Sequence, residues 1–277
     1  MLDARKDIMK ESIHTLFDLS GKVALITGGH SWLGFDMAQA LASAGCHIAL
    51  ASRNQEKLKK AGAELSENYG TQIFLFQADQ RFPDQVQAMA DAVYTWKGHI
   101  DILINNAGGG SGASEGCFLK RDPQDITDMI TVNLLGPLYC CQSVGRYMAE
   151  QNSGKIINIG SIAGVVGRDR DMYRRNHKME QPVDYAASKA GIIGMTRDLA
   201  AFMAPYHVQV NCISPGGFDK GDLPQGFVDD YARATMTGRM GTMGLDIKGA
   251  ALFLASPASD YVTGHNLMVD GGFSVFK

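Results

Sequence analysis

Residues 23–34 read VALITGGHSWLG, a strand-like run followed by a glycine-containing turn. The first five residues, Val23–Thr27, are mostly apolar and β-branched, which is typical of a strand that is buried on both faces. Apolar residues with helical spacing then extend from Leu33 to Ala44, and Gly45 ends the pattern. A buried strand that turns within a few residues into a helix predicts the first half of a β–α–β unit.

The same alternation continues to the end of the chain. Helical stretches separate six further strand-like runs, at His47–Ser52, Ile73–Gln77, Asp101–Asn105, Lys155–Gly160, Val208–Ile213 and Asn266–Val269. Right-handed crossovers between parallel strands place helices on both faces of a sheet. We therefore expect an α/β fold, with a doubly wound parallel sheet of about seven strands in a three-layer αβα arrangement. Residues 21–277 are predicted to form one domain, and residues 1–20 an N-terminal arm.

Composition and charge indicate which classes of protein this sequence can belong to. Apolar residues make up 45% of the 277 residues and charged residues 20%, which supports a large core. The net charge of −3 gives no basic field that would favour nucleic acid or an anionic membrane as a partner. The five cysteines form no C-x-x-C pair, and the sequence contains no apolar leader or membrane-spanning run. We expect a cytoplasmic protein with free thiols.

The turn after the first strand has the chemistry of a phosphate-binding site. Backbone N–H groups at a helix N-terminus bind a diphosphate when no side chain blocks the approach. Gly28 allows the tight turn, and Gly34 lets the helix pack closely on the strand. We expect the remaining residues of the loop to contact a dinucleotide too, namely His30, Ser31, Trp32 and Leu33.

The end of the second strand indicates which dinucleotide is bound. Folds that bind NAD use an acidic residue there to hold the ribose 2′-hydroxyl, and this chain has none at that place. Ser52 and Arg53 instead offer a hydroxyl and a guanidinium fork, which suit a 2′-phosphate. The prediction is NADP, with NAD as the alternative.

A candidate catalytic pair lies at the start of the helix after the fifth strand. Tyr185 and Lys189 are four residues apart, so they share one face of the helix. A nearby cation favours the phenolate, so we expect Lys189 to lower the pKa of Tyr185 and make it a general base for a substrate alcohol. Ser161, at the end of the fifth strand, can stabilise charge on the reacting oxygen.

These motifs resemble those of the short-chain dehydrogenases/reductases. The first turn is similar to their T-G-x-x-x-G-x-G motif, residues 105–108 to N-N-A-G, and residues 185–189 to Y-x-x-x-K. The resemblance covers residues 21–272. It implies a Rossmann-type fold and an NAD(P)-dependent oxidoreductase that interconverts a secondary alcohol and a ketone by hydride transfer. It also implies that Asn133 holds a helix bulge and a water relay to the lysine. The further cofactor contacts that it implies are Asp79, Asn106, Ala107, Gly108, Tyr185, Lys189, Pro215 and Gly216.

Two positions depart from the family pattern. Trp32 stands where the family has its middle glycine. We hypothesise that the indole lines the pocket near the cofactor, and the alternative is that it packs into the core beside the first helix. The threonine that usually follows the P-G motif and binds the carboxamide is also missing, and Phe218, Asp219 and Lys220 stand there. We expect Phe218 to take part in cofactor binding.

The substrate is predicted from a charge-rich segment between Ser161 and Tyr185. Residues 168–180 read RDRDMYRRNHKME and leave the fifth strand beside Ser161, so we expect them to rim the substrate mouth. A basic rim suits an anionic small molecule such as a sugar acid. The alternative is a solvated loop or a subunit contact. The candidate substrate contacts are Arg168, Arg174, Arg175 and His177.

A second wall of the mouth is expected from residues 217–244, which in the family often close over the substrate. Residues 16–22 and 239–241 look similar to gluconate 5-dehydrogenase-like members of the family, which implies a sugar-acid or polyol substrate. A 3-oxoacyl thioester remains the alternative substrate, and a non-catalytic dinucleotide sensor the alternative class.

Other chemistries find little support in the sequence. The first loop lacks the lysine of a P-loop nucleotide hydrolase. The seven histidines form no H-x-x-x-H pair, so no metal site is expected. In the family, the helices after strands four and five pair between subunits. The corresponding stretches, residues 134–148 and 186–203, are apolar enough for a homotetramer or homodimer.

Overall fold

A computed structural model of the protein describes residues 12–109 and 116–276. Seven parallel strands form the central sheet, in the order β3-β2-β1-β4-β5-β6-β9. The strands are β1 (Val23–Thr27), β2 (His47–Ser52), β3 (Ile73–Gln77), β4 (Ile102–Asn105), β5 (Gly154–Ile159), β6 (Val208–Pro215) and β9 (Asn266–Val269). Their bounds agree with the predicted strands to within two residues, and the doubly wound parallel sheet is confirmed.

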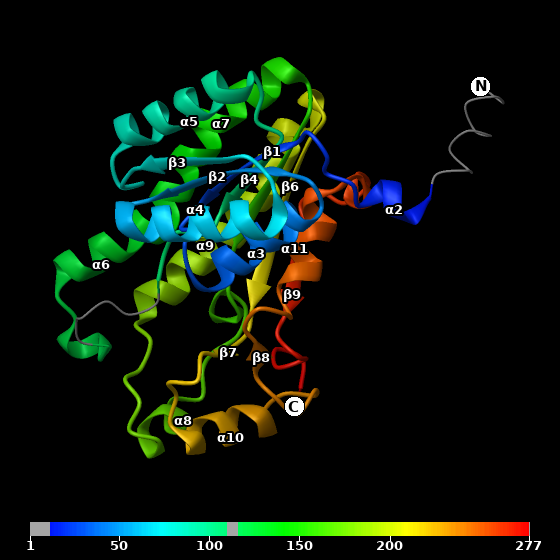
Figure 1. The fold of residues 1–277 in the computed structure, drawn as a ribbon. Coiled ribbons are helices and arrows are strands. Elements are labelled where there is room, and N and C mark those ends of the chain that lie inside the picture. The colour runs from blue at the N-terminus through cyan, green and yellow to red at the C-terminus, as the bar shows by residue number, and fades with distance from the viewer. Residues whose placement is uncertain (1–11, 110–115, 277) are drawn as a thin grey trace.

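Helices cover both faces of this sheet (Figure 1). One layer contains α3 (Trp32–Ser43), α4 (Gln55–Tyr69) and α11 (Lys248–Ala255), and the other contains α5 (Pro83–Lys97), α7 (Gly136–Gln151) and α9 (Val183–Met203). The side chains of β1 show why the strands are so apolar. Ala24 and Ile26 are buried in the core on one face, whereas Val23 and Leu25 are buried in the core on the other. Each strand position therefore meets a helix layer.

The strand order reverses between β1 and β4. The chain first builds β1, β2 and β3 in one direction, then returns to place β4 on the other side of β1. Ligands of such sheets bind in the crevice that opens beyond the carboxyl ends of the strands at this point. The loops after Thr27 and Asn105 meet there.

The helical stretch after β4 contains an irregular turn. Here α6 (Pro123–Ile130) continues through a π-helical turn, η2 (Thr131–Leu135), into α7. Gly136 and Pro137 are residue types at which helices often break, and the structure places the irregular turn directly before them. Because Pro137 has no N–H, the carbonyl one turn earlier cannot receive its usual α-helical bond, which makes that turn the place where the helix deviates.

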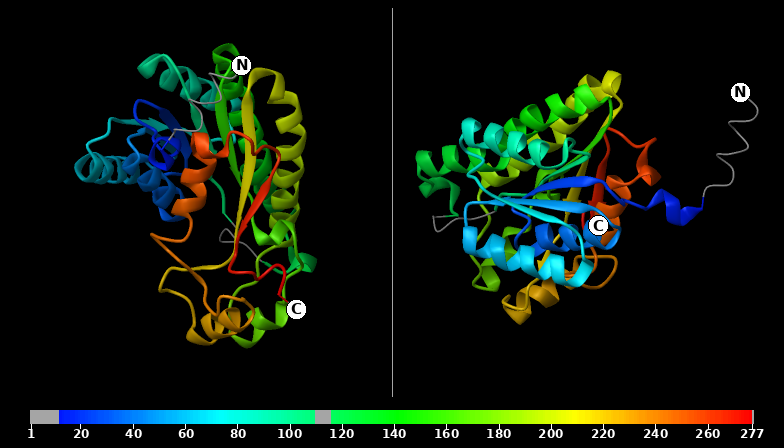
Figure 2. Two further views of the ribbon diagram at one scale, coloured as in Figure 1. Left: turned by 90° about the vertical axis from the view of Figure 1, so that its right-hand side faces the viewer. Right: turned by 45° about the horizontal axis from the view of Figure 1, so that its top comes forward.

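Two segments form a small unit beyond the carboxyl ends of the strands. The predicted insertion contains α8 (Arg170–Arg175), and residues 217–244 contain β7 (Phe218–Asp219), α10 (Gln225–Arg233) and β8 (Gly241–Thr242). Figures 1 and 2 show α8 and α10 side by side below the sheet. A cluster of buried side chains joins them: Met172, Phe227, Tyr231 and Met240. The wall that is expected from residues 217–244 is thus a folded one, since it shares an apolar core with the insertion.

The remaining described elements are short. They are α2 (Ile13–Leu16), η1 (Phe118–Lys120), η3 (Ile162–Gly164), η4 (Ala204–Tyr206) and η5 (Pro257–Ser259). The helix α2 belongs to the predicted N-terminal arm, of which residues 1–11 lie outside the described residues. Among the helices of the described ranges, none has the length and apolar character needed to cross a membrane.

Candidate active site

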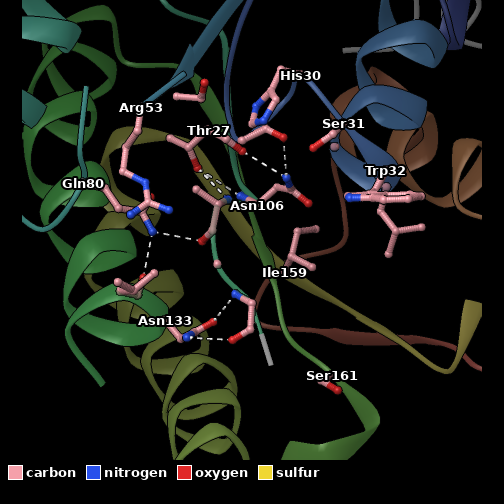
Figure 3. A pocket seen from close by; sticks show the side chains of 18 of the residues that line it. Thr27, His30, Ser31, Trp32, Arg53, Gln80, Asn106, Asn133, Ile159 and Ser161 are labelled. Atoms are coloured by element: carbon pink, nitrogen blue, oxygen red, sulfur yellow. Dashed lines mark hydrogen bonds between the residues drawn. The ribbon is translucent and has the colours of Figure 1, made fainter. Parts of the chain in front are cut away.

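A groove of about 1310 Å³ lies at the carboxyl ends of the strands (Figure 3). All four predicted catalytic residues line it: Asn133, Ser161, Tyr185 and Lys189. The predicted cofactor residues line it as well: Gly28, His30, Ser31, Trp32, Leu33, Gly34, Ser52, Arg53, Asp79, Asn106, Ala107, Gly108, Pro215, Gly216 and Phe218. The fold therefore brings residues from the carboxyl ends of six strands, from η2 and from α9 into one continuous space.

The first turn is locked onto the loop after β4. Gly28 has φ +66°, a left-handed conformation that suits glycine, and its carbonyl accepts a hydrogen bond from the Asn106 side-chain amide at 3.1 Å. The same amide donates to the Thr27 carbonyl at 3.1 Å. A Cβ on Gly34 would lie 2.5 Å from the Gly28 carbonyl oxygen and would collide with Asn106. Gly34 is thus required for close packing, and the Gly28 N–H also takes part in the fold, since it donates to the Ala51 carbonyl at 2.7 Å.

Trp32 lies at the rim of the groove and not in the core. Its φ of +52° is a left-handed conformation, and 53% of its surface is exposed. Figure 3 shows the indole to the right of Asn106 and below Ser31, at the edge of the pocket. The Lys220 ammonium lies over the ring, 4.0 Å from its centroid.

The end of β2 gathers polar and basic groups. Besides Ser52 and Arg53, the groove is lined here by His30 and Lys57. Burial, followed by the charge of Lys57, lowers the pKa of His30, and its Nδ1 atom is buried with no hydrogen-bond partner among the described residues. Sequence reasoning missed Lys57, although its position four residues after Arg53 would have indicated it. Arg53 and Lys57 supply positive charge for a 2′-phosphate, and Ser52 and His30 supply polar groups that can form hydrogen bonds to it.

The π-helical turn positions Asn133. Its side-chain amide donates to the Gly109 carbonyl at 3.2 Å, and its Oδ1 accepts from the Gly109 N–H at 3.0 Å. The carbonyl of Val132, which the irregular turn leaves available, accepts a hydrogen bond from Gln80 at 2.7 Å. Gln80 also donates to the Ala107 carbonyl at 2.9 Å. Gln80 was missed, although it directly follows Asp79 after β3. Asp79 itself is paired with Arg81 at 2.6 Å.

Tyr185 and Lys189 share one face of α9, as their spacing predicts. The Lys189 ammonium lies 5.7 Å from the centroid of the Tyr185 ring and donates to the Ile159 carbonyl at 2.7 Å. Burial lowers the pKa of Lys189 to about 8. Ser161 lies at the end of β5, and its hydrogen bond to the phenol favours the ionised form of Tyr185. The groove thus holds a hydroxyl, a phenol and an ammonium next to one another.

Comparison with known proteins identifies the family. A family model described as Enoyl-(Acyl carrier protein) reductase matches residues 29–274. The 2-dehydro-3-deoxy-D-gluconate 5-dehydrogenase of Formosa agariphila is 34% identical over 93% of this chain and 94% of its own length. The 3-oxoacyl-(acyl-carrier-protein) reductase of Chlamydia muridarum is 34% identical over 92% of this chain and 98% of its own. A crystal structure of a gluconate 5-dehydrogenase from Burkholderia cenocepacia in complex with NADP and tartrate is 33% identical, with a TM-score of 0.84 over 95% of this chain and 99% of that one.

The chain belongs to the short-chain dehydrogenase/reductase family. It is accordingly an oxidoreductase of the type that acts on CH–OH groups.

The phenol of this short-chain dehydrogenase/reductase has an unexpected environment. Burial raises the pKa of Tyr185 above its ordinary value, and the Ser161 hydrogen bond and the charge of Arg168 oppose this effect. The Arg168 guanidinium carbon lies 5.4 Å from the centroid of the Tyr185 ring. The expectation that Lys189 lowers this pKa is not met, because burial outweighs the cations and Lys189 is bound to the Ile159 carbonyl.

A smaller pocket of about 160 Å³ adjoins the groove at Ser161 and Tyr185. Its walls come from the insertion, from residues 217–244 and from neighbouring segments, and they include Arg168, Tyr173, Gln181, Tyr231 and Phe273. Gln181 offers a buried side-chain carbonyl oxygen that has no hydrogen-bond partner among the described residues. Because this pocket meets the groove at the phenol, it is the part of the site that a substrate would fill.

Only one of the four predicted substrate residues lines this pocket, namely Arg168. Arg174 is paired with Asp171 at 2.8 Å, and Arg175 with Asp230 at 2.5 Å. His177 lies in the turn after α8 with φ +49°. These three lie outside both the groove and the pocket, since acidic neighbours hold the arginines at the surface. In the described ranges, no three His, Cys, Asp or Glu side chains are grouped in a way that could hold a metal ion.

Proposed function

We propose that the protein is an NADP-dependent oxidoreductase that interconverts a secondary alcohol and a ketone in an anionic, hydroxylated small molecule such as a sugar acid. The observation that carries the proposal is the position of Tyr185. Its phenol lies where the dinucleotide groove meets the small pocket, and the centroid of its ring is 5.7 Å from the Lys189 ammonium and 5.4 Å from the Arg168 guanidinium carbon.

The residues of the groove fit a dinucleotide. The turn at Gly28 and Gly34 presents backbone N–H groups at the N-terminus of α3, which suits a diphosphate. Ser52, Arg53 and Lys57 suit a 2′-phosphate. When NADP is bound, its nicotinamide accepts or supplies the hydride.

The proton chemistry belongs to the chain's own residues. In the oxidation direction, the Tyr185 phenolate takes the proton of the substrate hydroxyl, while the Ser161 hydroxyl donates a hydrogen bond to the same oxygen. The Ser161 hydrogen bond and the charge of Arg168 favour the phenolate, and Lys189, with a pKa of about 8, can exchange protons near neutral pH. Tyr185→Phe should therefore abolish turnover and keep NADPH binding. Full turnover in this variant would favour a different catalyst, and absence of turnover in the wild type with every substrate would favour the sensor alternative.

The choice of NADP can be tested at Arg53. Arg53→Met should raise the KM for NADPH about ten- to a hundredfold and leave the KM for NADH unchanged, because a charge-assisted phosphate contact contributes about 1.5–3 kcal/mol. A wild-type enzyme that prefers NADH would contradict the proposal. The related gluconate 5-dehydrogenase structure, which contains NADP, supports it.

The substrate class is proposed from Arg168 and Gln181. The guanidinium offers a fork for a carboxylate, and the unpaired Gln181 oxygen offers an acceptor for a hydroxyl. The same related structure contains tartrate, a hydroxylated dicarboxylate. We expect a screen that follows NADPH absorbance to find higher kcat/KM with sugar acids than with the matching polyols. Arg168→Met should remove this difference, whereas Arg174→Met, outside the pocket, should keep it. Higher kcat/KM with 3-oxoacyl thioesters would favour the alternative that the Chlamydia relative represents.

We also propose a homotetramer or homodimer as the working form, in the cytoplasm. Exposed apolar side chains on the outer faces of α7 and α9, such as Leu138 and Phe202, support an assembly through these helices. Analytical ultracentrifugation tests it, and a monomer at micromolar concentration would contradict it.

A further inference from the structure

Trp32 and Lys220 connect two walls of the dinucleotide groove. Trp32 begins α3, directly after the glycine turn, and Lys220 follows β7 on the opposite segment. Both side chains line the groove. The 4.0 Å between the ammonium and the indole centroid is the shortest cation–π distance among the described residues.

The indole at position 32 is unfavourable for the stability of the fold. A bulky residue with φ +52° is strained, and a large aromatic side chain that is 53% exposed loses the benefit of burial. Glycine at this position would avoid both penalties. The contact with Lys220 offsets part of this cost, since a cation over the face of tryptophan is the strongest kind of cation–π pair.

The segment that carries Lys220 contacts α3 a second time, at the end of the segment that lies farther along the chain. The Asp36 carboxylate accepts a hydrogen bond from the Gly244 N–H at 2.7 Å. Between these ties, β7 pairs with β8, and the Phe218 ring packs so closely on Gly241 that a Cβ there would lie 2.8 Å from it. Residues 218–244 therefore form a folded strap that is joined to the first helix at both ends.

We propose that Trp32 and Lys220 form a clamp over the diphosphate of the dinucleotide. The indole face holds the ammonium next to the N-terminus of α3, where the backbone N–H groups of the glycine turn bind the same diphosphate. Lys220 supplies the positive charge from residues 218–244, and Trp32 supplies the aromatic face that keeps it there. The clamp rests on the proposed dinucleotide binding, and it explains why tryptophan stands in a glycine position.

Two ligands separate the clamp from the rest of the cofactor site. NADPH contains the diphosphate, whereas adenosine 2′-monophosphate contains only the 2′-phosphate end. Lys220→Met and Trp32→Gly should each weaken NADPH binding by about three- to thirtyfold, mainly through faster dissociation in stopped-flow fluorescence. Both variants should bind adenosine 2′-monophosphate as the wild type does. The double variant should have the same Kd for NADPH as whichever single variant binds it more weakly, because both substitutions remove the same contact.

A matched control exists on the surface. Lys97 lies over Trp96, 5.1 Å from the ring centroid, and neither residue lines the groove. Lys97→Met should leave both affinities unchanged. The clamp would be overturned if Lys220→Met bound NADPH like the wild type, or if the effects of the two single variants added. A wild-type protein that binds neither ligand would instead overturn the proposed function. Thermal unfolding of Trp32→Gly, at or above the wild-type Tm, checks that this variant folds.

Discussion

Replacing Lys189 with methionine tests whether the enzyme keeps a buried charge for its chemistry at the expense of stability. Lys189 is only 6% exposed, and its ammonium is bound to the Ile159 carbonyl. Burial lowers the pKa of this ammonium from an ordinary 10.5 to about 8. The folded protein therefore binds this proton more weakly than the unfolded chain does.

The sign and size of the effect follow from this difference. Between pH 8 and 10.5 the unfolded chain keeps the proton and the folded protein releases it, so the free energy of unfolding rises with pH in this window. The whole interval corresponds to roughly 3 kcal/mol, which is lost in full below pH 8. When the pH rises from 7 to 9.5, the release of the Lys189 proton should increase the free energy of unfolding by about 2 kcal/mol. Methionine at this position has no proton to release.

Urea unfolding at pH 7 and at pH 9.5 measures the effect. The free-energy difference between Lys189→Met and the wild type should favour the variant by about 2 kcal/mol more at pH 7 than at pH 9.5. Cysteine and tyrosine residues also titrate in this range, but they do so in both proteins and cancel. Lys59→Met, at an exposed lysine of α4, serves as the control and should show no such change. An equal pH dependence in wild type and Lys189→Met would refute the reasoning.

Two further substitutions test the packing behind the site. Gly34→Ala should lower the free energy of unfolding by about 1–3 kcal/mol and weaken NADPH binding, because the new methyl group collides with Asn106. Gly249→Ala is the matched control in an open part of α11 and should stabilise the protein by about 0.4–1 kcal/mol; chemical unfolding measures both, and equal effects would contradict the packing argument. Arg121→Met should cost about 3–5 kcal/mol in urea unfolding, because it leaves the buried Asp184 carboxylate, 2.9 Å from the guanidinium, without its partner; a loss under 1 kcal/mol would argue against a stable ion pair.

The fold and the position of the site could be predicted because both depend on local patterns. Apolar runs such as Val23–Thr27 mark strands, and the rule that parallel strands end at one edge brings the loops after them together. This rule suffices to place Gly28, Asn106 and Tyr185 in one groove, although they lie far apart in the sequence.

The electrostatics of the site could not be predicted, because they depend on contacts between distant segments. The sequence shows Arg175 as one of several cations beside the substrate mouth, yet Asp230, which neutralises it, belongs to another helix. The pKa of Tyr185 depends on how deeply the ring is buried, which spacing along α9 does not reveal. The Lys220 contact with Trp32 likewise joins residues whose separation in sequence gives no hint of it.

Residues 217–244 connect the two halves of the site. Their Lys220 reaches the cofactor groove, while their Tyr231 forms a wall of the substrate pocket. Tyr231 is held by the Gly217 N–H at 2.5 Å, and its helix α10 is held by the ion pair of Asp230 with Arg175. Arg175 therefore acts on the substrate pocket indirectly, because it fixes the helix that carries Tyr231. Residues 217–244 therefore couple the position of Lys220 in the groove to that of Tyr231 in the pocket.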